Sequence, residues 1–173
     1  FKGPVYLRFT REKTPVFTTA ETPFEIGKAL IFRDPALENR MPDAVIIACG
    51  PLVHNAILAA GELFKEGVEC LVVNNHTIKP MDTETIIDVA KRSGAVVTVE
   101  EHQINGGLGS AVCEILAENY PVPLERVGVR DRFGESGEPN EVIEAVGMGV
   151  KSIKEAVKKV LKVLKSSIAR MKA

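Results

Sequence analysis

Short, β-branched apolar runs alternate with stretches of helical periodicity over most of this chain. Each run, such as AVIIAC at 44–49, is continuous rather than alternating, which is typical of strands buried on both faces. Between the runs, apolar residues recur at helical spacing, which predicts helices with one buried face. We expect strands over residues 44–49, 69–74, 95–100 and 125–129, and helices over residues 54–67, 83–94, 111–119, 139–147 and 150–171.

This order of elements predicts an α/β fold. Parallel strands require crossover connections, and helices between successive strands supply them, so that both faces of the sheet are covered. Residues 25–32 add an edge strand that can run antiparallel, because no helix separates it from the strand at 44. The expected architecture is a three-layer αβα sandwich around a mostly parallel sheet of about five strands.

The first 24 residues do not continue this pattern. PVYLRFT, residues 4–10, alternates apolar and polar positions as a strand does, and an extended, proline-containing segment follows it. A single strand has no partner of its own and is not stable alone. We therefore divide the chain into residues 1–24, the end of a neighbouring domain with its linker, and residues 25–173, one α/β domain.

Composition narrows the range of partners. The formal net charge is −1, so the chain lacks the basic field that binding to nucleic acid or to an anionic membrane requires. No apolar run reaches the roughly 20 residues of a membrane-spanning helix, and the N-terminus does not resemble a secretory signal. The three cysteines have no CxxC spacing, which favours buried thiols in a reducing cytoplasm over a metal site.

The most suggestive local feature is EEHQINGGLGS, residues 100–110. It lies between a strand and a helix, where open α/β sheets place ligands. Two interpretations are open from the residues alone. Gly106, Gly107, Gly109 and Ser110 either form a tight turn that lets the helix pack on the sheet, or leave the amides of the helix N-terminus free to bind an anion. The pattern is neither GxGxxG nor a P-loop, since no lysine follows it.

Side chains at two strand ends are candidates for contact rather than catalysis. Glu101 and His102 follow a strand, but Glu100 and Glu101 are neighbours that point to opposite faces, so they do not converge as a pair. After the next strand, Arg132 and Phe133 lie in a polar loop, where the aromatic ring is suited to anchoring a partner. With no evident nucleophile or metal-ligand cluster, these residues do not predict an autonomous enzyme.

Three segments together resemble the C-terminal domain of transketolase. They are TIKPMD at 77–82, VTVEEHQINGGLGSAVCEIL at 97–116 and VGVRDRFGESGEP at 127–139, in the family's order and spacing, and the likeness extends through AVIIACG at 44–50. The opening PVYLRFTRE, residues 4–12, resembles the last strand of the family's preceding, pyrimidine-binding domain. Deoxyxylulose-phosphate synthases and the β subunits of 2-oxoacid dehydrogenases share this domain and are the alternatives.

The resemblance implies a thiamine-diphosphate enzyme that transfers a two-carbon ketol unit from a ketose phosphate to an aldose phosphate. In the family, other domains bind the cofactor and its divalent metal, through a GDG…N motif and a glutamate that have no counterpart in this chain. The chain would then bind no cofactor alone, and would serve packing against the N-terminal and middle domains and assembly of a homodimer, through residues 100–110 and 130–137. An alternative of another class is a non-catalytic regulatory module that binds an anion at Gly106–Ser110.

One substrate-binding position carries over from the family. The arginine after the last middle-domain strand binds the sugar phosphate, and the matching stretch here is Phe9-Thr10-Arg11-Glu12, which makes Arg11 the candidate. A guanidinium meets two phosphate oxygens at once, which suits this role. Thr10 and Glu12 depart from the family's Ser and Gln, and Arg8 is the alternative in a shifted register.

Overall fold

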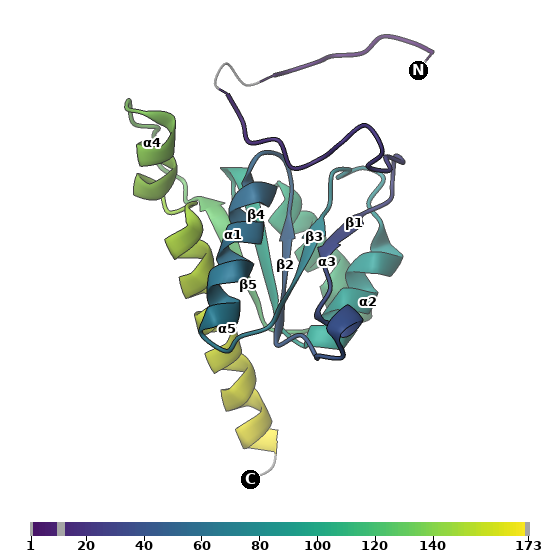
Figure 1. The fold of residues 1–173 in the computed structure, drawn as a ribbon, viewed down its shortest axis with the longest axis vertical. Helices are drawn as coiled ribbons and strands as arrows, with labels where there is room; N and C mark the ends of the chain where they lie inside the picture. Colours follow the sequence, from purple (N-terminus) through teal and green to yellow (C-terminus); the bar gives the residue numbers. More distant parts are fainter. Residues whose placement is uncertain (1, 10–12, 172–173) are drawn as a thin grey trace.

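A single sheet with helices on both faces forms the body of the molecule (Figure 1). The structure, a computed structural model, describes residues 2–9 and 13–171. The strands are β1 (Leu30–Arg33), β2 (Ala44–Ala48), β3 (Cys70–Asn74), β4 (Val96–Gln103) and β5 (Leu124–Val129). The helices are α1 (Leu52–Lys65), α2 (Thr83–Ser93), α3 (Leu108–Asn119), α4 (Pro139–Ala145) and α5 (Val150–Met171), with a short 3-10 turn, η1 (Pro35–Glu38), before β2.

The strand order is β1-β3-β2-β4-β5. Strands β2 to β5 are parallel to their neighbours, and β1 pairs with β3 in the antiparallel sense. This confirms the predicted mostly parallel sheet with an antiparallel edge. The edge strand is shorter than the expected 25–32, because Gly27 has a positive φ of 85° and the Lys28 amide bonds back to the Glu25 carbonyl, which makes a turn of residues 25–28.

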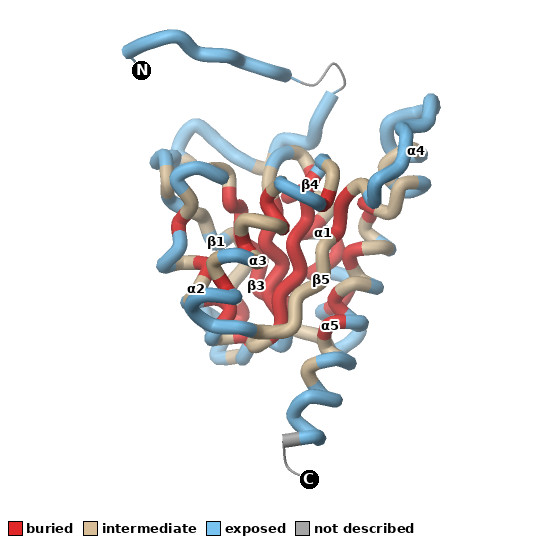
Figure 2. Tube along the Cα trace, turned by 180° about the vertical axis from the view of Figure 1, so that it is seen from behind, coloured by how far each residue is buried: buried red, intermediate tan, exposed pale blue. Residues whose placement is uncertain are grey.

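Successive residues of each strand point to opposite faces, so the sheet carries two separate apolar clusters. Ile46 and Val97 pack with α1 and α5, whereas Val45 and Val96 pack with α2 and α3. The strands between these layers are the most buried part of the chain (Figure 2). The three-layer αβα sandwich is therefore confirmed.

Two of the element boundaries that differ from the sequence expectation lie at the loop of residues 100–110. Strand β4 continues to Gln103, past the expected end at 100, because Gln103 still pairs with Val129 of β5. Helix α3 begins at Leu108 rather than at 111, so the glycine-rich segment forms its first turn. The connection between β4 and α3 is consequently limited to residues 104–107.

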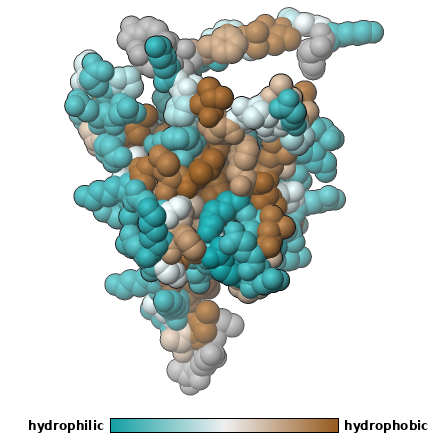
Figure 3. All heavy atoms as spheres, viewed as in Figure 1, coloured by the Kyte–Doolittle hydropathy of each residue, from teal (hydrophilic) through white to brown (hydrophobic). Residues whose placement is uncertain are grey.

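The N-terminal segment crosses above the sheet as an extended chain (Figure 1). No strand pairing occurs among its described residues 2–9, where Tyr6 is 87% and Phe9 84% exposed. Hydrophobic residues are accordingly visible on the surface of this segment in the space-filling view (Figure 3). Further along, the Phe17 ring packs edge-on against Phe32, which attaches the linker to the domain.

Helix α5 closes the fold and continues past the end of the sheet opposite to that segment (Figure 1). Its first half packs against α1, and Lys154 bonds Glu62 and Glu66 at 2.7 and 2.8 Å. No helix in the described part of the chain is both long enough and apolar enough to cross a bilayer.

Candidate functional site

The connections that leave the carboxyl ends of β2 and β4 run in opposite directions. From β2 the chain passes through α1 to β3, and from β4 it passes through α3 to β5 on the other side of the sheet. Ligands of open α/β sheets bind at such a point, where neighbouring connections diverge. A crevice of about 240 Å³ lies here, lined among others by Cys49, Gly50, Pro51, Glu100, Glu101 and His102.

Glu100 is the buried charged group of this edge. Its residue is only 2% exposed, and its two carboxylate oxygens accept the N–H groups of Leu108 at 2.7 Å and Gly109 at 2.8 Å. The N-cap of α3 is Gly107, which has no side chain to cap the helix, so Glu100 does this from β4. The amides that an external anion would use therefore already bind the chain's own carboxylate.

A second set of hydrogen bonds fixes the segment between β4 and α3. The Ile104 amide donates to the Val129 carbonyl at 3.0 Å, and the Ile104 carbonyl accepts from Arg126 at 2.9 Å. The Ser110 hydroxyl accepts the Gly106 amide at 2.8 Å. Ser110, one of the candidate anion ligands, is thus engaged within the segment itself.

The glycines of this segment are required by close approach. A Cβ on Gly107 would lie 1.9 Å from the Glu100 carboxylate, and one on Gly109 would lie 2.7 Å from the Thr98 hydroxyl. Gly106 has a φ of 81°, in the left-handed region that favours glycine. The tight-turn interpretation accounts for all three positions.

Glu101 and His102 are exposed at the same edge. Glu101 points away from Glu100, as the strand alternation predicts. His102 lies with its side chain 60% exposed and its Nδ1 3.9 Å from a Glu100 oxygen, while the same nitrogen donates to the Gln103 carbonyl at 2.6 Å. His102 is therefore held by its neighbours but open to a partner.

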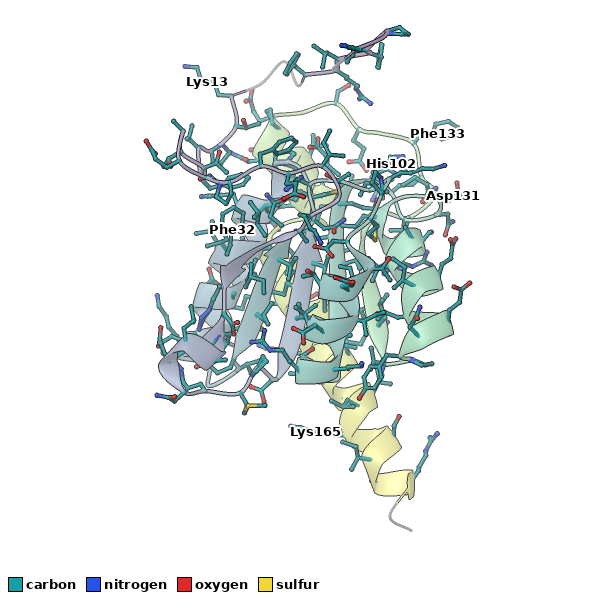
Figure 4. All side chains as sticks on the ribbon, turned by 90° about the vertical axis from the view of Figure 1, so that its right-hand side faces the viewer. Lys13, Phe32, His102, Asp131, Phe133 and Lys165 are labelled. Atoms are coloured by element: carbon teal, nitrogen blue, oxygen red, sulfur yellow. The ribbon has the colours of Figure 1, made fainter. Side chains whose placement is uncertain are left out.

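The loop after β5 joins this edge. The side-chain amide of Gln103 donates to the Asp131 carboxylate at 3.3 Å. This bond joins the end of β4 to the loop after β5. Figure 4 places His102, Asp131 and Phe133 at one end of the molecule and Lys165 at the other. Arg132 pairs with Glu135 within the loop, and Phe133 is 98% exposed. The candidate contact residues of both loops thus share one surface.

Neither an activated nucleophile nor a metal cluster accompanies these groups in the described residues. Burial, reinforced by the charge of Glu100, raises the pKa of the Cys49 thiol to about 12, so this sulfur is protonated at neutral pH. No three His, Cys, Asp or Glu side chains in the described ranges are grouped to hold a metal ion.

The TIKPMD motif bonds the residue that precedes β1 to the start of α2. Asp82 caps α2 by accepting the Thr85 amide, and it also accepts the Ala29 amide at 3.0 Å, a contact that the sequence pattern does not predict. Burial raises the pKa of Asp82, but these hydrogen bonds outweigh burial and leave the pKa below its ordinary value. Nearby, Phe24 packs its ring on His76 with a centroid distance of 4.6 Å.

Comparison with known families decides the relationship. The family model described as transketolase, C-terminal domain, matches residues 36–153. This chain belongs to the transketolase C-terminal domain family. The resemblance of the three sequence segments is thereby confirmed. In the structure these segments form the glycine turn, the bond between Asp82 and the Ala29 amide, and the exposed loop after β5.

Individual transketolase relatives support the same placement. The chain is 43% identical over 158 residues to 6-deoxy-6-sulfo-D-fructose transketolase subunit SqwH of Clostridium sp. (strain MSTE9). The matched region covers 91% of this chain and 47% of that protein. It is 41% identical to a Methanocaldococcus jannaschii protein named for the C-terminal section of transketolase, of which it covers 49%. It is 36% identical over 159 residues to 1-deoxy-D-xylulose-5-phosphate synthase of Trichormus variabilis.

A solved transketolase structure confirms the fold. The structure described as a split gene transketolase, inactive beta4 tetramer, superposes with a TM-score of 0.81 at 38% identity, over 88% of this chain and 48% of that one. This chain therefore spans about half the length of the subunits it matches, and about a quarter of the synthase.

Arg11, the candidate for the substrate-binding arginine, lies outside the described residues. On either side of it, Arg8 and Lys13 line a crevice of about 420 Å³ together with Asn55 and Glu101. The crevice joins the N-terminal segment to the edge that carries Glu101 and His102. A transketolase cofactor is not accommodated by the described residues of this edge, since the α3 amides that suit a diphosphate hold Glu100.

Proposed function

We propose that this chain is the C-terminal part of a transketolase subunit, which in the assembled enzyme moves a two-carbon ketol unit from a ketose phosphate to an aldose phosphate. The observation that carries the proposal is the 43% identity, over 91% of the chain, to a protein named as a transketolase subunit. The chain's own part is to pack against the other domains and to hold the homodimer together.

The carboxyl edge of the sheet is the surface that meets the preceding half. Exposed apolar groups gather there on two separate pieces of chain, Tyr6 and Phe9 on the N-terminal segment and Phe133 on the loop after β5. Single exposed apolar residues are common, but several at one edge mark a contact. Residues 1–24 are the end of the preceding domain and its linker, and residues 25–173 are the C-terminal domain.

Thiamine diphosphate and its divalent metal are bound by the other domains. In the described residues no group of His, Cys, Asp and Glu side chains is placed to hold a metal ion, and the Leu108 and Gly109 amides at the start of α3 bond Glu100. Thiamine diphosphate, bound elsewhere in the assembly, would supply carbanion stabilisation. The assembly works in a reducing cytoplasm, which agrees with the free thiols of Cys49, Cys70 and Cys113.

Arg11 binds the phosphate of the sugar substrate. Two basic residues close to it in the sequence, Arg8 and Lys13, line a crevice that also includes Glu101, and their positive charge favours an anionic substrate there. Replacing Arg11 with Ala in the assembled enzyme is expected to raise KM for phosphorylated sugars more than for unphosphorylated ones. Equal losses for both would remove Arg11 from this role.

The runner-up function is deoxyxylulose-phosphate synthesis, in which pyruvate condenses with a triose phosphate. The 36% identity to a synthase over 90% of the chain favours it, but the identities to the transketolase subunit and section are higher. The two reactions differ in their donor, which is a ketose phosphate in one and pyruvate in the other. Donor use therefore separates them.

A chimera tests the proposal directly. In it, this chain replaces the matching half of the split-gene transketolase chain, and the product is co-expressed with the other product of the split gene. We expect ketol transfer between a ketose phosphate and an aldose phosphate, without pyruvate consumption, with the parent enzyme as control. Calorimetry should show thiamine diphosphate binding to the chimera and none to this chain alone.

Two outcomes would overturn the proposal. A chimera that fails to assemble with the other product of the split gene, under conditions in which the parent enzyme assembles, would contradict the assignment to a transketolase subunit. Micromolar binding of thiamine diphosphate by this chain alone would contradict the assignment of the cofactor to the other domains.

A further inference from the structure

The buried carboxylate of Glu100 is an internal anion. Both of its oxygens act as acceptors, from Leu108 and Gly109, which matches the acceptor-only character of an ionised carboxylate. The partial positive charge at the N-terminus of a helix favours such a group, and 12-residue α3 has no cap from its own N-terminal residue. Glu100 thus takes the place of an external ligand at this helix.

The backbone around Glu100 is shaped to the carboxylate. Gly107 approaches it so closely that a Cβ would overlap its oxygen, and the same Cβ would lie 3.0 Å from Nδ1 of His102. Gly128 of β5 lies beneath, where a Cβ would be 2.8 Å from the His102 carbonyl. The glycines, the carboxylate and His102 form one closely packed unit.

His102 is the exposed member of this unit. Its ring extends from the end of β4 to the surface that carries Asp131 and Phe133 (Figure 4). The backbone that follows His102 is fixed by hydrogen bonds to β5, since the Ile104 amide donates to Val129 and the Ile104 carbonyl accepts from Arg126. A side chain presented on such a rigid support meets a partner without loss of backbone freedom.

We propose that Glu100 is a positioning residue whose charge holds the 104–110 turn against β4 and thereby fixes His102 at the contact edge. That this edge meets the preceding half rests on the proposed function. The fixing of the turn and of His102 is a property of this chain alone and can be measured without the assembled enzyme.

The test is removal of the carboxylate and its return as a small anion. Glu100→Ala should accelerate hydrogen exchange of the Leu108 and Gly109 amides by at least about tenfold, since both lose a bond to a charged acceptor. It should also shift the His102 ring signals in NMR spectra. Excess formate, which fits the vacated space, should return the exchange rates and the ring signals at least halfway to the wild-type values.

Two matched variants show that charge and place both matter. Glu100→Gln keeps the size but turns an amide NH2 group toward a backbone donor, so it should resemble Glu100→Ala and, with the space filled, gain nothing from formate. Glu101→Ala removes the neighbouring exposed carboxylate and should change neither the exchange rates nor the ring signals. If Glu100→Ala does not fold, the Gln variant carries the comparison with wild type.

Three results would overturn the proposal: unchanged exchange and ring signals in Glu100→Ala, no response of that variant to formate, or wild-type behaviour in Glu100→Gln. In the chimera, we expect Glu100→Ala to lower kcat for ketol transfer. Formate should restore that kcat as well. A chimera without transketolase activity would contradict the proposed function while leaving these amide and ring measurements on the chain unaffected.

Discussion

The two ends of the sheet use charged residues in opposite ways. At the end where β2 and β3 begin, Glu69 pairs with Arg33 at 2.8 Å and with Arg40 at 3.0 Å, and the Arg40 guanidinium lies 4.6 Å above the Phe64 ring. These side chains bond one another across separate elements, and Glu69 is only 14% exposed. This end joins the loops to the domain and contributes to its stability.

At the end where β2 and β4 finish, polar and aromatic groups face outward instead. Glu100 is buried there and bonds backbone amides, whereas His102 and Phe133 are exposed. Residues that serve binding are commonly carried on connections positioned by a fixed scaffold. The two ends therefore differ in what their carboxylates bond: Glu69 bonds side chains of other elements, whereas Glu100 bonds backbone amides beneath exposed groups.

The largest effect is expected at the support beneath the contact edge. Gly107→Ala places a Cβ in the Glu100 carboxylate and should lower the free energy of unfolding by about 1–3 kcal/mol. Gly134→Ala, in the exposed loop with nothing within 4 Å of the new Cβ, should change it by less than about 0.5 kcal/mol. Urea denaturation measures the free energy of unfolding of both variants. Equal values for Gly107→Ala and Gly134→Ala would show that the segment around Glu100 is not rigid.

The opposite end should respond next. Glu69→Gln removes the shared partner of two arginines that are partly exposed, and should lower the free energy of unfolding by about 1–2 kcal/mol. Glu38→Gln removes a more exposed partner of Arg40 and should cost less than about 0.5 kcal/mol. Neither change should alter dimer assembly of the chimera. A loss of assembly in Glu69→Gln would break the division between the two ends.

Exposed apolar residues allow the reverse comparison. Phe133→Ser should change the stability of this chain by less than about 0.5 kcal/mol, yet weaken assembly of the chimera by at least about tenfold if Phe133 anchors a partner. Leu37→Ser, at the other end and 86% exposed, should change neither quantity. Sedimentation of the two chimera variants measures the difference, and equal assembly would remove Phe133 from the contact.

The smallest effect concerns pH at the stabilising end. Hydrogen bonds from Lys154 and Lys158 lower the pKa of Glu66 to about 2 from 4.5. Because the folded-state pKa is the lower one, the stability it contributes is present above pH 4.5 and is lost as the pH falls toward 2. Unfolding measured across this range should be less pH-dependent in Glu66→Gln than in wild type or in Glu84→Gln, which alters an exposed glutamate outside these pairs.

Most of the fold follows from local patterns. The continuous runs at 44–49 and 69–74 predict strands buried on both faces because a parallel sheet covered by helices allows no polar side, and these strands are fully buried. The antiparallel edge strand follows from the missing helix before residue 44. The end of β4 could not be predicted, since the Gln103–Val129 pairing depends on where β5 lies.

The site was predictable only in outline. Strand alternation separates Glu100 from Glu101, and the order of strands and helices places both loops at one edge. The partner of Glu100 was missed because its carboxylate reaches amides eight and nine residues along the chain, across a turn whose shape depends on that same carboxylate. An N-cap glycine without an acceptor side chain is the signal that points to such a partner.

Hydrogen exchange of the chimera, compared with this chain alone, tests the central claim most directly. The account predicts added protection in residues 100–110 and 130–137, at the carboxyl edge, with unchanged exchange in residues 34–43 and 66–69 at the other end. Added protection at the other end, or none at the carboxyl edge in a fully assembled chimera, would contradict it.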